Sequence, residues 1–153
     1  MAKDVVHFRE ESMGELWEEF WTLAQRHWQE TEGHIREELN PRKEAYLRYS
    51  ELGVFFAFTS RNEEGKLVGY CGMYIMPSMH TGKMVAREDF WYIAPEYRKG
   101  FHAIRFIRFV ERALKEKGAV CCHISAKLAN GAGRILEYMK YKNVSALYFK
   151  RLT

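Results

Sequence analysis

Two adjacent carboxylates precede a basic glycine turn in this sequence, and residues of these types at this spacing can do chemistry. Glu88 and Asp89 open the stretch "EDFWYIAPEYRKG", which ends with Arg98, Lys99 and Gly100. A carboxyl group in an apolar setting has a raised pKa and can take a proton from a substrate. Cations and free backbone N–H groups at a helix start bind phosphate. The stretch therefore predicts a proton acceptor close to an anion site.

A strand, a turn and a helix are expected to position these residues. The segment 84–93, "MVAREDFWYI", has the aromatic and apolar residues of a strand. The segment 101–117 carries apolar residues at helical spacing and basic residues on its other side. A strand that leads through a glycine turn into a helix leaves the first N–H groups of that helix without partners. The order of these elements therefore supports an anion site at the turn.

The rest of the chain predicts a single domain, residues 1–153, of the α/β class with a mixed (α+β) sheet. The expected order is a strand, two helices, three strands, a helix, a strand, a helix and a strand. The other strands are expected at 5–8, 54–60, 66–76, 119–125 and 144–152, and the other helices at 10–30, 40–52 and 130–142. In the second helix, Asn40 is the expected cap and Pro41 the first residue.

Composition narrows the class of protein. Hydrophobic residues make up 47% and charged residues 29% of the 153 residues, which is typical of a soluble globular domain. No apolar run approaches the roughly 20 residues of a membrane span, and the N-terminus lacks a secretory signal, so we expect a cytoplasmic protein without a membrane partner. The three cysteines and six histidines have neither the pattern of a disulfide framework nor the spacing of a zinc site, so we expect no metal.

Charge is distributed unevenly along the chain. Residues 1–60 carry a formal net charge of −5 and residues 61–153 one of +9. Acidic residues around the end of the first helix suit a cationic substrate, and they are Glu30, Glu32, Glu37 and Glu38. Basic residues form a stripe on the 101–117 helix, namely Arg105, Arg108, Arg112 and Lys115. Because no stacking aromatics alternate with this stripe, nucleic-acid binding is the weaker interpretation of it.

The segment "YIAPEYRKGFHAIRFIRFVE" resembles the GCN5-related N-acetyltransferases, the GNAT family. That family shows an apolar strand end, then V-x-P-x-x-R, a glycine-rich turn and a helix. Ile93, Pro95 and Arg98 match the first part of this pattern, and Ala103 matches the last position of the turn. Phe101 stands where the first glycine is usual. The element order along the chain resembles the compact, stand-alone members of the family, such as those of phage genomes.

The resemblance implies a GNAT fold with a splayed central sheet and acetyl-CoA as the co-substrate. Main-chain groups at the end of the 84–93 strand would pair with pantetheine, and N–H groups of the turn would hold the pyrophosphate. A second family motif, on the helix expected at 130–142, begins with an asparagine. The co-substrate residues implied in this way are Tyr92, Ile93, Ala94, Arg98, Lys99, Gly100, Phe101, His102, Ala103 and Asn130.

Catalysis requires a base, because an amine must lose its extra proton before it can attack a thioester. Glu88 is the expected base, and Asp89 is the second candidate. Neighbouring residues of a strand point to opposite faces of the sheet, so we expect only one of the two to face the acceptor. The alternative interpretation is that both are surface charges at the start of a strand.

Tyr138 is the expected acid for the leaving thiolate, and Tyr141 is its rival. Family members commonly place a tyrosine about seven residues after the asparagine, whereas here Tyr138 follows Asn130 by eight. The N–H of Ile93 is the expected oxyanion donor. His80 lies in an expected turn, where it faces either the acceptor or solvent.

The sequence thus predicts an N-acetyltransferase that moves an acetyl group from acetyl-CoA to a primary amine by direct attack in a ternary complex. The alternative is a GNAT-shaped module that binds CoA or a partner with little catalysis. The altered turn motivates that alternative, because Gly100 lies one residue before the usual glycine position. Nucleic-acid binding by the basic stripe is the third hypothesis. The residues leave open whether the chain forms a homodimer.

Overall fold

A five-stranded sheet and four α-helices make up residues 5–153, the part of the chain that the structure, a computed structural model, describes. In chain order the elements are β1 (Val6–Glu11), α1 (Met13–Thr31), α2 (Lys43–Glu51), β2 (Phe55–Asn62), β3 (Leu67–Pro77), β4 (Met84–Ile93), a 3-10 turn (Pro95–Tyr97), α3 (His102–Glu116), β5 (Cys121–His123) and α4 (Ala132–Tyr138). Residues 1–4 begin the stretch considered above for a secretory signal, and they lie outside the described residues.

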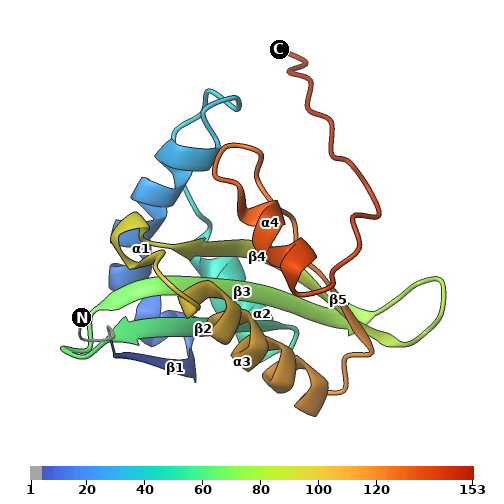
Figure 1. The fold of residues 1–153 in the computed structure, drawn as a ribbon. Helices are drawn as coiled ribbons and strands as arrows, with labels where there is room; N and C mark the ends of the chain where they lie inside the picture. Colours follow the sequence, from blue (N-terminus) through green and yellow to red (C-terminus); the bar gives the residue numbers. More distant parts are fainter. Residues whose placement is uncertain (1–4) are drawn as a thin grey trace.

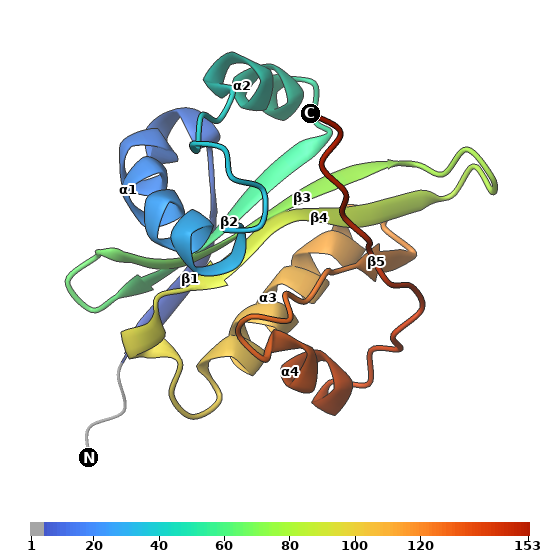
Figure 2. The same ribbon diagram turned by 90° about the horizontal axis from the view of Figure 1, so that it is seen from above.

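The strands lie in the order β1-β2-β3-β4-β5 (Figure 1). The first four pair antiparallel, and β5 joins β4 in parallel after the α3 crossover. Figure 2 shows α1 and α2 on one face of the sheet and α3 and α4 on the other. This mixed architecture confirms the predicted fold class.

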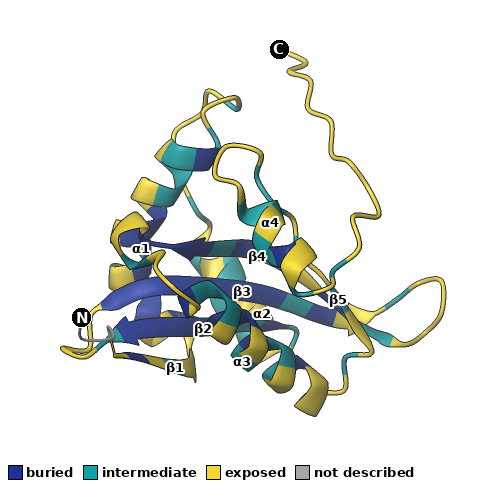
Figure 3. Ribbon diagram, viewed as in Figure 1, coloured by how far each residue is buried: buried dark blue, intermediate teal, exposed yellow. Residues whose placement is uncertain are grey.

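Helix α1 combines an N-terminal cap with one apolar face. Ser12 Oγ accepts a hydrogen bond from the Glu15 N–H at 3.3 Å. Met13, Leu16 and Phe20, spaced by three and four residues, are buried against the sheet. Buried residues fill the central strands in Figure 3, with one core cluster under α1 and a second under α3. Within residues 5–153, no helix is both long and apolar enough to cross a membrane.

A β-bulge in β4 shifts the alternation of its side chains. Gly72 of β3 lies opposite Phe90, whereas the next residue, Met73, lies opposite Glu88, so Asp89 is the extra residue of β4. A Cβ atom on Gly72 would lie 2.5 Å from Cζ of Phe90. Only glycine leaves room for that ring, and the bulge therefore depends on this residue.

Several predicted elements are shorter than expected. Helix α4 spans Ala132–Tyr138 and not 130–142, because Gly131 before it and Lys140 after it adopt positive φ values. Helix α2 begins at Lys43, because Arg42 is its N-cap with a non-helical ψ of 88°, so Asn40 and Pro41 remain in the preceding loop. Strand β5 spans Cys121–His123 and not 119–125, because the N–H of Ser125 bonds the side chain of Glu88.

The strand expected at 144–152 is not formed in the described structure. Most of its apolar side chains are left uncovered, and Leu147 and Tyr148 are 92% and 90% exposed. The segment runs instead toward the loop between α1 and α2 (Figure 2), where Arg151 donates to Ile35 O and to Glu37 Oε1, each at 2.8 Å. The apolar residues at 146–149 are compatible with a strand, but a strand needs a partner edge, and none pairs with this segment within residues 5–153.

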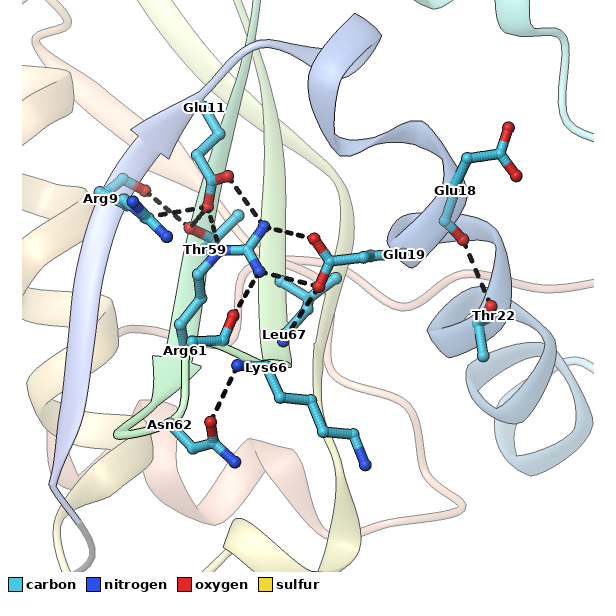
Figure 4. A network of polar contacts seen from close by, with 11 residues as sticks. Arg9, Glu11, Glu18, Glu19, Thr22, Thr59, Arg61, Asn62, Lys66 and Leu67 are labelled. Carbon is cyan, nitrogen blue, oxygen red and sulfur yellow. Dashed lines mark hydrogen bonds and ion pairs between the residues drawn. The ribbon is translucent and has the colours of Figure 1, made fainter.

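A buried arginine ties β1, β2 and α1 together (Figure 4). Arg61 is 7% exposed, and all five of its N–H groups donate: two to Glu11, two to Glu19 and one to Gly65 O, at 2.8–2.9 Å. The Thr59 hydroxyl also donates to Glu11. Because a buried guanidinium is stable only when its donors are satisfied, this network fixes how α1 and β1 sit on the sheet.

The network predicts a pH-dependent stability. Burial pushes the pKa of Glu11 up, but hydrogen bonds from Arg61 and Thr59 outweigh burial and leave the pKa lowered. Glu11 therefore contributes stability that is fully present above the ordinary glutamate pKa of about 4.3 and is lost as the pH falls through the lower folded-state pKa. We expect Glu11→Gln to reduce the free energy of unfolding at pH 7 and to reduce it much less at pH 3, as measured by urea unfolding. If Glu11→Gln lowered the free energy of unfolding equally at pH 7 and pH 3, this prediction would be contradicted.

Candidate active site

Strands β4 and β5 part after three residue pairs. Val85–Arg87 lies beside Cys121–His123, and no strand within residues 5–153 pairs with this edge of β4 beyond that point. Where the ladder ends, Glu88 Oε2 accepts hydrogen bonds from Ser125 N at 3.1 Å and Ser125 Oγ at 2.6 Å. The carboxylate thus takes the place of a main-chain partner at the point where the two strands separate. We call the gap between β4 from Glu88 onward and the chain from Ser125 onward the V. The splay implied by the family resemblance is present.

The edge of β4 that faces the V offers main-chain groups. Ala94 N–H donates to Val68 O of β3 at 2.8 Å. Because bonding alternates along an antiparallel pair, Tyr92 also pairs with β3, whereas the N–H and C=O of Ile93 point into the V. Arg98 Nε donates to that carbonyl at 2.7 Å. Of the three residues expected to pair with pantetheine, Ile93 is therefore the one whose main chain is directed to the V.

Helix α3 starts without a side-chain cap. Phe101 is its N-cap residue and forms no capping hydrogen bond, and the first turn holds no acidic residue. Within the described residues the N–H of Ala103 has no backbone partner. Gly100 adopts a φ of +57°, which glycine tolerates best. Lys99 and Arg105 are exposed around this turn, so free N–H groups and positive charge coincide as an anion site requires.

Two residues expected to bind the co-substrate meet at Glu30, near the end of α1. Arg98 Nη2 donates to both carboxylate oxygens of Glu30 at 3.0 and 2.8 Å, and Asn130 Nδ2 donates to one of them at 3.2 Å. The guanidinium also lies over the Tyr92 ring, 5.0 Å from its centroid. Burial pushes the pKa of Glu30 up, but these hydrogen bonds outweigh it and leave the pKa lowered. The Arg98 side chain is thus held against α1, and its contact with phosphate stays a prediction.

A cavity of about 60 Å³ lies between the V and the end of α1. It is lined by His27, Glu32, Glu88, Asp89, Trp91, Ser125, Lys127, Asn130 and Ala132. Both Glu88 and Asp89 line this cavity, although only one of the two was expected to face the acceptor. Asp89 accepts a hydrogen bond from Tyr46 of α2, and Glu88 accepts one from Ser125 after β5. The two side chains therefore leave β4 in different directions, and both line the cavity at the open edge of this strand.

Burial raises the pKa of both carboxyl groups in the cavity. For Glu88, burial outweighs the hydrogen bonds from Ser125, which lower the pKa. For Asp89, burial outweighs the hydrogen bond from the Tyr46 hydroxyl at 2.5 Å. Neither carboxylate forms an ion pair within residues 5–153. Lys127 also lines the cavity, but its ion pair is with Glu32. A carboxylate with a raised pKa and no ion pair of its own is suited to accept a proton.

His27 lines the same cavity and was not among the predicted site residues. It lies seven residues after Phe20 and so shares the inward face of α1. Its Nδ1 lies 2.8 Å from the Tyr70 hydroxyl, and its ring stacks on Tyr92 with centroids 4.5 Å apart. Burial lowers the pKa of His27 to about 4, so the imidazole is neutral at pH 7. A polar residue on an apolar helical stripe was the signal that could have found it.

The other two histidines considered above lie away from the cavity. The His102 imidazole is buried and bonds Ser60 Oγ at 2.7 Å and Tyr97 O at 2.8 Å. Its side chain therefore faces the core, and only its main chain remains at the start of α3. His80 is exposed in the turn between β3 and β4 and does not line the cavity.

The two tyrosines considered as acids also lie outside the cavity lining. Tyr138 ends α4 and is 62% exposed. Tyr141 donates to Glu111 Oε1 at 2.6 Å and lies 3.4 Å from Cys122 Sγ. Tyr141 is therefore bound to α3, whereas the Tyr138 hydroxyl forms no hydrogen bond within residues 5–153.

Most of the acidic residues expected to attract a cationic acceptor are neutralised. Glu32 forms an ion pair with Lys127, and Glu37 forms one with Arg151. Glu30 is paired as described above. The uncompensated negative charge at the site belongs instead to the two carboxylates of β4. No group of three His, Cys, Asp or Glu residues within residues 5–153 could hold a metal ion.

Comparison with known proteins identifies the fold family. Residues 13–132 match the model of the Acetyltransferase (GNAT) family. The chain belongs to the GNAT acetyltransferase family. A search of curated protein sequences finds no match. The predicted resemblance and the predicted acyltransferase class are thereby confirmed.

Solved structures of GNAT acetyltransferases superpose on nearly the whole chain. A ribosomal-protein-alanine N-acetyltransferase from Brucella melitensis biovar Abortus 2308 has a TM-score of 0.73 at 19% identity and covers 97% of this chain and 100% of its own. An aminoglycoside acetyltransferase from an uncultured soil metagenomic sample, in complex with sisomicin, has a TM-score of 0.75 at 12% identity and 97% coverage of both chains. The aminoglycoside N-acetyltransferase AAC(6')-Iy in complex with CoA has a TM-score of 0.70 at 15% identity, covering 98% and 96%. At these identities the likeness concerns the fold.

Proposed function

We propose that this GNAT enzyme transfers the acetyl group of acetyl-CoA to a primary amine by direct attack in a ternary complex. The observation that carries the proposal is the V between β4 and β5. It connects an uncapped helix start, suited to a phosphorylated donor, with a cavity that holds two carboxylates, suited to an amine. Two substrates bound in this way would meet at the open edge of β4.

Three features fit acetyl-CoA. The free N–H groups at the start of α3, together with Lys99, suit its pyrophosphate. The N–H and C=O of Ile93 suit an amide of pantetheine, once Arg98 releases the carbonyl. The indole N–H of Trp91 is buried at the V without a hydrogen-bond partner among the described residues, and it is a donor available to a ligand. A solved neighbour with CoA bound supports the same donor.

The reaction forms a C–N bond and breaks the C–S bond of the thioester. Glu88 is our proposed base: its Oε2 is held by Ser125, while Oε1 has no partner within residues 5–153 and can take the proton of the amine. The N–H of Ile93 would donate to the oxyanion that forms on the carbonyl. Tyr138 stays the proposed acid for the leaving thiolate.

Replacing Glu88 by glutamine tests this function. We expect kcat to fall by about 10²- to 10⁴-fold, because the base is lost. The acetyl-CoA dissociation constant should change little, since Glu88 lies outside the turn that binds phosphate. Steady-state kinetics with a panel of primary amines and calorimetry with acetyl-CoA measure the two quantities.

Two matched variants complete this test. Asp89→Asn removes the neighbouring charge and should lower kcat less than Glu88→Gln does, and Tyr138→Phe should lower kcat if its hydroxyl protonates the thiolate. Equal kcat values for Glu88→Gln and the unaltered enzyme would refute the role of Glu88. A protein that binds acetyl-CoA but acetylates no amine of the panel would favour the alternative of a CoA-binding module.

The raised pKa of Glu88 predicts the acidic limb of the pH profile. A base must be deprotonated to act, so kcat/KM should fall as the pH drops through the pKa of Glu88. Because burial raises that pKa, the fall should occur at a higher pH than for an ordinary glutamate. Rates measured from pH 4 to 9 would follow this limb. An acidic limb that persists unchanged in Glu88→Gln would assign it to another group.

A further inference from the structure

His27 is the one uncharged titratable side chain among the residues that line the cavity. Its ring is fixed on two sides, by the stack on Tyr92 at 4.5 Å and by the contact between Nδ1 and the Tyr70 hydroxyl at 2.8 Å. Its other nitrogen, Nε2, has no hydrogen-bond partner within residues 5–153. A ring held in this way keeps Nε2 in one direction, and that nitrogen is left for a ligand.

The contact with Tyr70 determines which nitrogen of His27 carries the proton. Tyr70 is 1% exposed, and His27 Nδ1 is the one hydrogen-bond partner of its hydroxyl among the described residues. Burial raises the pKa of Tyr70 well above its ordinary value, so the phenol keeps its proton. If Nδ1 carried a hydrogen, the phenol hydrogen would be buried without an acceptor. Tyr70 therefore donates to Nδ1, and in a neutral ring the hydrogen lies on Nε2.

We propose that the Nε2–H of His27 donates a hydrogen bond to an oxygen of the acceptor, and that this enzyme selects primary amines with a hydroxyl or carbonyl oxygen close to the nitrogen. The inference rests on the proposed function, since it concerns the second substrate of that reaction. In this proposal His27 is a specificity-determining residue, and Glu88 of β4 remains the proposed base.

The other groups of the cavity are complementary to such an acceptor. Glu88 and Asp89 are carboxylates that form no ion pair within residues 5–153, and they suit the nitrogen of the acceptor while it is an ammonium ion. His27 is neutral at pH 7 and so does not repel that ion. An amine without an oxygen would satisfy the carboxylates and leave the Nε2–H without a partner. Such an acceptor should be used less well.

Variants of His27 can distinguish the role of Nδ1 from the role of Nε2. Asparagine places a polar atom near the position of Nδ1 and loses Nε2, whereas glutamine extends an amide to the position of Nε2. The probes are glycinamide and ethanolamine, which carry an oxygen, and propylamine, which does not. The ratio of kcat/KM between variant and unaltered enzyme, taken for each amine, cancels the differences in amine basicity. His80→Gln is the matched control, because His80 is exposed and is not among the residues that line the cavity.

We expect His27→Asn to lower kcat/KM about tenfold for glycinamide and ethanolamine and less than about twofold for propylamine, as the loss of one hydrogen bond implies. His27→Gln should retain more of the selectivity, and His80→Gln all of it. An equal loss for all three amines, with thermal unfolding unchanged, would overturn the inference and leave the proposed function standing. If the unaltered enzyme acetylates none of the amines, the proposed function fails and this inference fails with it.

A second readout does not depend on activity. In ¹⁵N NMR spectra of the protein with labelled histidine, the His27 signal, identified by its loss in His27→Asn, should show a protonated Nε2 and an unprotonated Nδ1 at pH 7. Tyr70→Phe should remove this preference, because Nδ1 then loses its donor. A protonated Nδ1 in the unaltered protein would refute the assignment of the donor and overturn the proposal.

Discussion

Replacing Gly100 by glutamate is expected to weaken acetyl-CoA binding at least about a hundredfold, which corresponds to roughly 2.7 kcal/mol. Gly100 immediately precedes the N-cap of α3, where the free N–H groups are proposed to hold the pyrophosphate. A carboxylate at this point would repel the phosphates and compete for the same donors. Calorimetric titration of the purified protein with acetyl-CoA measures the effect.

The matched control for this change is Gly100→Gln. Gly100 has a φ of +57°, and a Cβ there would meet no atom within 4 Å, so glutamine and glutamate impose the same backbone strain and fill the same open space. That strain is about 1–2 kcal/mol. Glutamine should therefore weaken binding far less than glutamate does. Equal affinities of the two variants would show that the phosphates do not lie at this turn.

Replacing Arg61 by methionine is expected to lower the free energy of unfolding by about 3 kcal/mol, near the lower end of what breaking a buried ion pair costs. The change leaves Glu11, whose side chain is 14% exposed, without its two hydrogen bonds from the guanidinium. The expected loss in the free energy of unfolding is at the lower end because Glu19 is 46% exposed and can be hydrated when the arginine is lost. Urea unfolding at pH 7 measures the difference.

Arg26→Met is the matched control for Arg61→Met. Arg26 forms a two-point ion pair with Glu96, at 3.0 and 2.9 Å, but both side chains are nearly half exposed. Removing an exposed pair should change the free energy of unfolding by at most about 1 kcal/mol. Adding Glu11→Gln to Arg61→Met should recover part of the lost stability, because the orphaned charge is removed. A similar, small loss in both arginine variants would mean that burial does not set the strength of these pairs.

Local sequence patterns determined the elements that carry the site. Strand β4 begins and ends where its aromatic and apolar run does, at residues 84 and 93, and α3 differs by one residue at each end from the segment expected. The basic glycine turn between them follows from Arg98, Lys99 and Gly100 themselves. These features depend on residues close together in the chain, so periodicity, turn residues and charge were sufficient to predict them. The family resemblance also lay in this stretch.

Long-range contacts decided how these elements make a site. Glu88 ends the β4–β5 ladder through a bond to Ser125, 37 residues away, and Arg98 is turned toward α1 by Glu30, 68 residues away. The bulge of β4 depends on Gly72 of another strand, and His27 reaches the cavity from α1, about 60 residues before β4 in the chain. The last strand was expected at the apolar segment 144–152, and it did not form because no strand edge pairs with it within residues 5–153. A local pattern predicts that a segment can be a strand or a helix, but which distant groups satisfy its charges and hydrogen bonds is settled only when the chain is packed.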